Sequence, residues 1–96
     1  EDIYYFEAAG NYTYLFTKDG KLLVCENLKA CQDKMSGTPI LRIHKSYLIN
    51  MQNVKKWESE QVLLMNDARF SLGRQYKKEA RNTYLEFVKD WAQRRR

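Results

Sequence analysis

The spacing of hydrophobic residues changes once along the chain, close to Gly73. Before that point, apolar residues come in short runs rich in Tyr, Phe, Val and Ile, which is the pattern typical of β-strands. After it, apolar residues recur every three or four positions, which is the period of an α-helix. The sequence therefore predicts a mainly β fold that ends in an amphipathic helix.

The first part of the chain divides into short strands separated by turn signals. We expect strands over residues 3–7, 12–17, 22–25, 40–43, 54–57, 61–65 and 68–72, whereas residues 47–51 fit either a strand or a turn of helix. Asn11 after Gly10, and Gly20 after Asp19, are typical turn sequences, and Asp-Gly is a strong hairpin signal.

Two helices are expected. Asn27 is a typical N-cap, and Leu28, Cys31 and Met35 follow it at helical spacing until a Gly and a Pro end the segment. The apolar stripe of the C-terminal helix comprises Tyr76, Ala80, Tyr84, Phe87 and Trp91. The aromatic residues that we expect in the core are Tyr14, Phe16, Trp57, Phe70 and Phe87.

The net charge of the chain is +5, and the basic excess lies in its last quarter. From Arg74 to Arg96 there are eight basic and three acidic residues, whereas residues 1–73 contain nine of each. Such an asymmetry is expected of a chain that binds a polyanion. The alternative interpretation of the three final arginines is a solvated tail.

Several classes of protein are disfavoured. A chain of 96 residues suits a single domain, and it has no apolar run long enough to span a membrane. Cys25, Cys31 and one histidine do not make a zinc site, so we expect no metal, no cofactor and reduced thiols, with a disulfide as the alternative. His44 and Ser46 lie two residues apart, but no catalytic motif accompanies them, so we expect no enzyme.

Three connections carry side chains that suit nucleic acid. The residues are Asn11, Tyr12 and Thr13, then His44, Lys45 and Ser46, and finally Arg74, Gln75, Lys77 and Lys78. Arginine reads guanine edges, Asn and Gln read adenine edges, and Lys, Ser and Thr suit phosphates. Arg42 adds a second cation beside Lys45 and Ser46, a set that suits an anion such as phosphate. Each connection alone also fits ordinary turn chemistry, and His44 also fits a partly buried structural role.

An ordered series of short motifs resembles LytTR DNA-binding domains. The motifs are residues 2–8 (DIYYFEA), 10–12 (GNY), Leu28, residues 41–50 (LRIHKSYLIN), 53–54 (NV) and 74–77 (RQYK). Lys45 stands where the family commonly has Arg, and Ile49 where it commonly has Val. Gly73 replaces a common Ser, and we expect this change to loosen the connection that holds Arg74.

The resemblance implies a fold, a function and partners. The fold over residues 1–96 would be an elongated, mainly β assembly of small antiparallel sheets, with one short internal helix and the C-terminal helix. The three connections would bind double-stranded promoter DNA in successive major grooves, at paired repeats and as a homodimer. The chain would be the cytoplasmic output domain of a bacterial two-component regulator, follow a receiver domain, and begin after the family's first strand.

Two alternative functions remain open from the sequence. The Tyr-rich β surface also suits a protein-interaction domain. Seven tyrosines also suit base stacking in a protein that binds RNA or single-stranded DNA.

Overall fold

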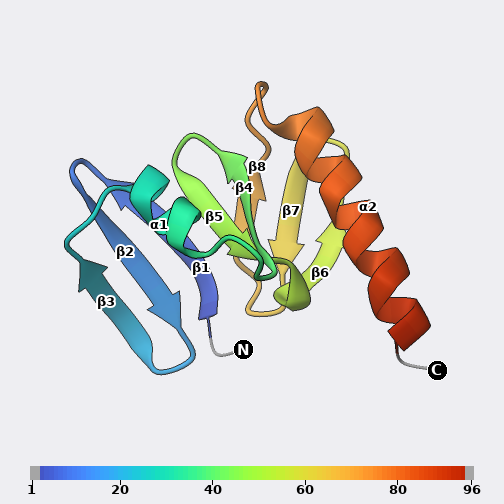
Figure 1. Ribbon diagram of the computed structural model, residues 1–96, viewed down its shortest axis with the longest axis horizontal. Helices are drawn as coiled ribbons and strands as arrows, with labels where there is room; N and C mark the ends of the chain where they lie inside the picture. Colours follow the sequence, from blue (N-terminus) through green and yellow to red (C-terminus); the bar gives the residue numbers. More distant parts are fainter. Residues whose placement is uncertain (1–2, 95–96) are drawn as a thin grey trace.

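The computed structural model describes residues 3–94, which form two antiparallel sheets and two α-helices (Figure 1). The strands are β1 (Ile3–Ala9), β2 (Tyr12–Thr17), β3 (Gly20–Val24), β4 (Ile40–His44), β5 (Tyr47–Asn50), β6 (Val54–Trp57), β7 (Gln61–Leu64) and β8 (Arg69–Ser71). The helices are α1 (Leu28–Lys34), the short 3₁₀ helix η1 (Met51–Asn53) and α2 (Lys77–Arg94). This mainly β architecture, with principal extents of 39 × 29 × 25 Å, confirms the predicted fold class.

Local sequence signals account for several element boundaries. The Asn27 side chain accepts a hydrogen bond from the Ala30 amide at 2.8 Å, which confirms it as the N-cap of α1. Gly20 has φ +126°, a conformation that side chains disfavour, and it closes the predicted hairpin between β2 and β3. The ambiguous residues 47–51 contain both predicted states, since β5 ends at Asn50 and η1 follows directly.

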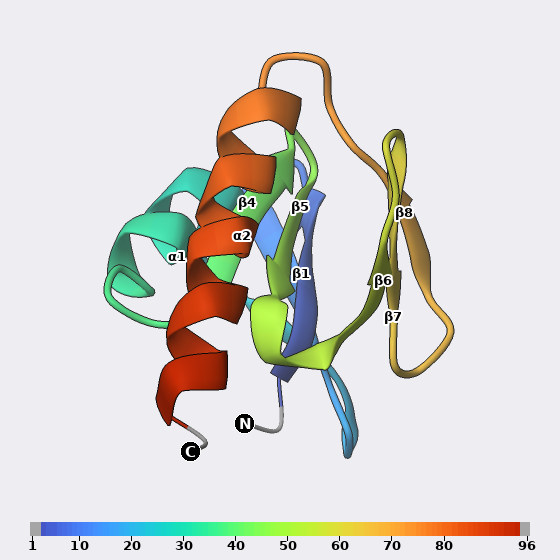
Figure 2. The same cartoon turned by 90° about the vertical axis from the view of Figure 1, so that its right-hand side faces the viewer.

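The strands of the larger sheet lie in the order β3-β2-β1-β5-β4, and those of the smaller sheet in the order β6-β7-β8. Figure 2 shows the larger sheet between α1 on one side and the smaller sheet on the other. Helix α2 packs against β4 and, through Tyr84, against Trp57 of β6, with the two rings stacked at a centroid distance of 4.6 Å.

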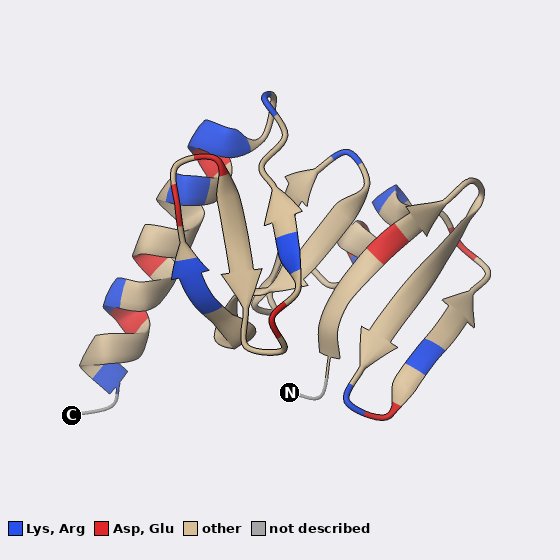
Figure 3. Cartoon of the chain, turned by 180° about the vertical axis from the view of Figure 1, so that it is seen from behind, with Lys and Arg blue, Asp and Glu red and all other residues tan. Residues whose placement is uncertain are grey.

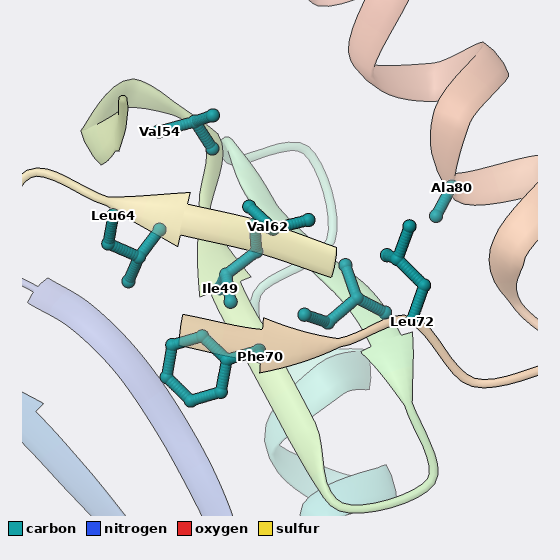
Figure 4. Packing of buried hydrophobic residues seen from close by; sticks show 8 residues of the cluster. Ile49, Val54, Val62, Leu64, Phe70, Leu72 and Ala80 are labelled. Atoms are coloured by element: carbon teal, nitrogen blue, oxygen red, sulfur yellow. The ribbon is translucent and has the colours of Figure 1, made fainter. Parts of the chain in front are cut away.

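Strand β5 contributes to a core on each face of the larger sheet. Neighbouring residues of a strand point to opposite faces, so Leu48 and Ile49 enter different clusters. Leu48 packs with Phe6, Leu28 and Cys31 beneath α1. The larger cluster lies between the two sheets and α2, and it comprises Ile43, Ile49, Val54, Val62, Leu64, Phe70, Leu72 and Ala80 (Figure 4).

The aromatic residues are less buried than predicted. Phe70 lies in the core as expected, at 7% exposure. Trp57 is half-buried and packs against the larger cluster, as a core residue should. Tyr14, Phe16 and Phe87 are half-buried and belong to neither cluster, so the prediction that they lie in the core is wrong for these three. The reason for the β2 residues is that the opposite face of this strand carries the inward-facing Thr13 and Leu15.

Asn50 joins the end of β5 to the start of β1. Its side chain is 2% exposed, donates to the Ile3 carbonyl at 2.8 Å and accepts from the Gln52 amide at 3.0 Å. Asn53 donates to the same Ile3 carbonyl at 2.8 Å. Two amides therefore hold one end of the central strand pair.

We expect Asn50→Ala to lower the free energy of unfolding by about 1–3 kcal/mol, because it removes the cap of η1 and a buried donor. Asn53→Ala should lower the free energy of unfolding by less, since Asn53 is half-buried and the Ile3 carbonyl still accepts a hydrogen bond from the Asn50 side chain. Chemical denaturation of both variants checks this order. Equal stability of Asn50→Ala and the wild-type protein would refute the structural role of Asn50.

Candidate nucleic-acid interface

The three connections singled out in the sequence lie at one end of the molecule (Figures 1 and 3). The β4–β5 connection is the middle one. Its Ser46 carbonyl accepts a hydrogen bond from the Ala8 amide at 2.9 Å, next to the β1–β2 turn. On the other side, the Gly73 amide of the β8–α2 connection donates to the Ile43 carbonyl at 2.8 Å. The fold thus brings together segments that are about 30 residues apart in sequence.

Arg42 supports the β4–β5 connection from inside. Its Nε donates to the His44 carbonyl at 2.7 Å, and its Nη2 donates to the Lys45 carbonyl at 2.8 Å. Its Nη1 donates to Gln32 of α1 at 2.7 Å, and the guanidinium lies 5.2 Å from the centre of the Tyr76 ring. Arg42 was expected to help grip an anion, but the structure directs its guanidinium at the protein's own backbone.

The His44 ring has a backbone partner as well. Its Nδ1 accepts a hydrogen bond from the Ser46 amide at 3.0 Å, which in the neutral ring leaves the proton on Nε2. The ring is half-buried and packs at 5.2 Å from the Tyr47 ring. The contact with Ser46 uses its backbone rather than its hydroxyl, so this geometry supports a turn instead of a base activating a nucleophile.

Gly73 permits a close approach between two of the connections. A Cβ atom at this position would lie 3.1 Å from Cδ2 of Tyr76 and 3.2 Å from Cα of His44. Both distances are shorter than ordinary van der Waals contact. The missing side chain therefore leaves room for His44 and Tyr76 beside Gly73, and the expectation that Gly73 loosens the connection stays a prediction.

The exposed groups surround a shallow hollow of about 290 Å³, lined by His44, Lys45, Gly73, Arg74, Gln75 and Tyr76. Lys45, Arg74 and Gln75 are exposed, as is Lys78 at the start of α2. Asn11 and Tyr12 are exposed at the β1–β2 turn, and Ser46 is half-buried. Three cations, two amides and a phenol therefore face solvent along this end.

Thr13 does not belong to this surface, which corrects the sequence prediction. Its side chain is fully buried, and its hydroxyl donates to the Glu26 carbonyl at 2.8 Å. Because β2 begins at Tyr12, the alternation of the strand turns Tyr12 outward and Thr13 inward. The alternating pattern of residues 12–17 was the available signal.

Lys77 has a partner within the protein. Its ammonium lies 2.9 and 2.8 Å from the two carboxylate oxygens of Glu60, in the β6–β7 connection. Arg95 and Arg96, which belong to the predicted basic tail, lie outside the described residues.

Other candidate chemistry finds little support in residues 3–94. Cys25 is exposed, Cys31 is buried, and both are free thiols. No group of three His, Cys, Asp or Glu residues in the described part is placed to hold a metal ion. Within the same residues, neither α-helix has the length and apolar character that a membrane crossing requires.

We expect Arg42→Lys to loosen the β4–β5 connection, because one ammonium cannot reproduce the three directed hydrogen bonds of the guanidinium. Hydrogen exchange should become faster at the Ser46 amide, and stability should fall by about 1–3 kcal/mol. Arg69→Lys, at an exposed position of β8, is the matched control and should change neither quantity. Unchanged exchange in Arg42→Lys would show that the guanidinium does not brace this turn.

Comparison with known proteins agrees with this architecture. A search of solved structures finds the LytTR DNA-binding domain of a methyl-accepting/DNA response regulator from Bacillus cereus, with 19% sequence identity and a TM-score of 0.75. The match covers 84% of this chain and 79% of that chain, and at this identity it shows a common fold. No curated protein sequence matches the chain.

A family model gives the classification. The model described as the LytTR DNA-binding domain matches residues 1–84, which is most of the chain and includes all three connections. With the ordered motifs and the two-sheet fold already in place, this match shows that the chain belongs to the family of LytTR DNA-binding domains.

Proposed function

We propose that this chain is a sequence-specific binder of double-stranded DNA and the output domain of a bacterial two-component transcriptional regulator. The observation that carries the proposal is the convergence of three connections at one end, where Lys45, Arg74, Gln75 and Asn11 are exposed together. Membership of a DNA-binding family supports the same conclusion. In this proposal the chain acts by binding and not by catalysis.

The exposed side chains suit different parts of a duplex. Arg74 carries a planar fork that fits the O6 and N7 acceptors of guanine, whereas Lys45 carries a point charge that suits phosphate. Gln75 and Asn11 can pair with an adenine edge in the major groove. Tyr12, Ser46, His44 through Nε2, and Lys78 complete the set with donors suited to phosphates.

The braced turn favours binding by preorganisation. Three hydrogen bonds fix residues 44–46. Arg42 donates to the His44 carbonyl, the Ser46 amide donates to the His44 ring, and the Ala8 amide donates to the Ser46 carbonyl. A segment that is already ordered loses less conformational entropy when it meets its ligand. Lys45, at the tip of this segment, is thus presented to the DNA backbone in a defined position.

The proposal extends to the cellular setting. The domain, over residues 1–96, would follow a receiver domain in a cytoplasmic regulator. Two copies would bind paired repeats in a promoter, so that each copy inserts its connections into a major groove. No membrane partner is part of this proposal.

Affinity for duplex DNA should fall steeply as salt is raised, with a log–log slope well below about −3, because each neutralised phosphate contributes about −0.9. Fluorescence anisotropy over a salt series measures the slope, with duplex, single-stranded DNA and RNA as parallel ligands. A flat response would contradict DNA binding and favour a protein partner. Stronger binding to RNA or single strands would favour the stacking alternative.

Arg74→Ala should weaken binding by about 1–3 kcal/mol and relax the preference at one base pair, as expected for a bidentate base contact. Lys45→Ala should instead weaken all sequences by a similar factor. Binding to every single-base variant of a selected site separates the two patterns.

The matched control is Lys55→Ala, which removes the same charge from a lysine paired with Asp67 beside the β7–β8 turn. It should leave affinity nearly unchanged. A uniform loss across all site variants in Arg74→Ala would make Arg74 a phosphate contact. A large loss of thermal stability would make it structural.

A further inference from the structure

An acidic segment lies beside the proposed DNA-binding surface. The β6–β7 connection, residues 58–60, contains Glu58 and Glu60, and Figure 3 shows its acidic positions next to the basic start of α2. The Leu72 amide donates to the Glu60 carbonyl at 2.9 Å, immediately before the β8–α2 connection. The backbone therefore fixes two carboxylates close to the segment that carries Arg74.

Glu60 holds the first lysine of α2. Both of its carboxylate oxygens lie within 2.9 Å of the Lys77 ammonium. The Lys77 side chain is 36% exposed and that of Glu60 is 74% exposed, so the pair lies at the surface. Such a surface pair contributes little to stability, yet it neutralises Lys77 while it is formed.

Glu58 keeps the same segment negative. Its carboxylate accepts a hydrogen bond from the side-chain amide of Gln61 at 2.7 Å, and the Lys56 ammonium lies 3.3 Å from the same carboxylate. The Gln61 hydrogen bond, and then Lys56, lower the pKa of Glu58 below its ordinary value. Glu58 therefore stays ionised at neutral pH and pairs with Lys56, as Glu60 pairs with Lys77, so neither lysine offers an unpaired charge to an approaching phosphate.

We propose that Glu60 sets one border of the DNA footprint, because it pairs with Lys77 and so withholds this lysine from the duplex. This inference rests on the proposed function. The footprint then runs from the β1–β2 turn through Lys45 to Arg74 and Lys78, and it stops at the β6–β7 connection. Lys77, which the sequence placed among the DNA-binding residues, serves as the internal partner of Glu60.

The consequence for specificity follows from the nature of phosphate contacts. A phosphate contact strengthens binding to every sequence alike, whereas base contacts act only at the correct site. Withholding one lysine therefore lowers the affinity for every sequence by a similar factor and leaves the ratio between specific and non-specific binding unchanged. In this scheme Glu60 limits the extent of the footprint and the overall affinity, and it touches no base.

The test is Glu60→Gln, which keeps the size and the backbone contact with Leu72 but removes the charge. Two ligands are used: a duplex of random sequence, and a duplex selected from a random pool for tight binding to the wild-type protein. On the random duplex at low salt, affinity should rise about 2–8-fold, and the salt slope should steepen by about 0.9, the value of one added phosphate contact. The ratio of selected to random affinity should stay the same, because the added contact is to phosphate and not to a base.

Asp67→Asn is the matched control. It removes one negative charge and releases Lys55, whose ammonium lies 3.5 Å from Asp67, at the other end of the smaller sheet. Its affinity and salt slope should equal those of the wild-type protein. An equal increase in affinity in Asp67→Asn and in Glu60→Gln would show that the increase comes from net charge alone, and it would overturn the proposal.

Lys77→Gln distinguishes the remaining explanations. Alone it should leave the affinity and the salt slope unchanged, and combined with Glu60→Gln it should abolish the gain. A shallower slope in Lys77→Gln alone would make Lys77 a DNA contact and overturn the inference. So would a Glu60→Gln protein with wild-type melting temperature and unchanged or weaker binding. Failure of the wild-type protein to bind either duplex would instead contradict the proposed function.

Discussion

The proposed interface depends on the hydrogen bonds of Arg42 more than on any exposed side chain. The guanidinium binds two consecutive carbonyls of the β4–β5 turn, an amide oxygen of α1 and the face of Tyr76 at the start of α2. Charge-assisted bonds of this kind are directional and strong. One side chain therefore links three elements that approach each other only in the folded chain, and it fixes where Lys45 lies.

The signature run of residues 42–50 has a different meaning in the structure from the one its chemistry suggests. Only Lys45 of these nine residues is exposed. Ile43, Leu48 and Ile49 are fully buried, and Asn50 holds the start of β1. The run therefore identifies a scaffold that presents one cation, Lys45, and the selectivity of the proposed interface rests on residues of the other two connections.

Sequence reasoning succeeded where the cause is local and failed where it is not. The cap at Asn27, the Gly20 hairpin and the helical stripe of α2 follow from interactions within a few residues, and the structure confirms them. The roles of Arg42 and Gly73 depend on partners brought near by the fold, so no local pattern could reveal them. Thr13 was different, since strand alternation places it on the face opposite Tyr12, but alternation alone does not say which of the two faces is buried.

The position of β5 has a consequence for how the domain can vary. Leu48 and Ile49 are neighbours, yet they fill cores on opposite faces of the same sheet. A shift of one residue in this strand would turn each of the two side chains to the opposite face, so that each would meet the core that the other one fits. Insertions and deletions are thus confined to the turns, and the two cores are obliged to form or melt as a single cooperative unit.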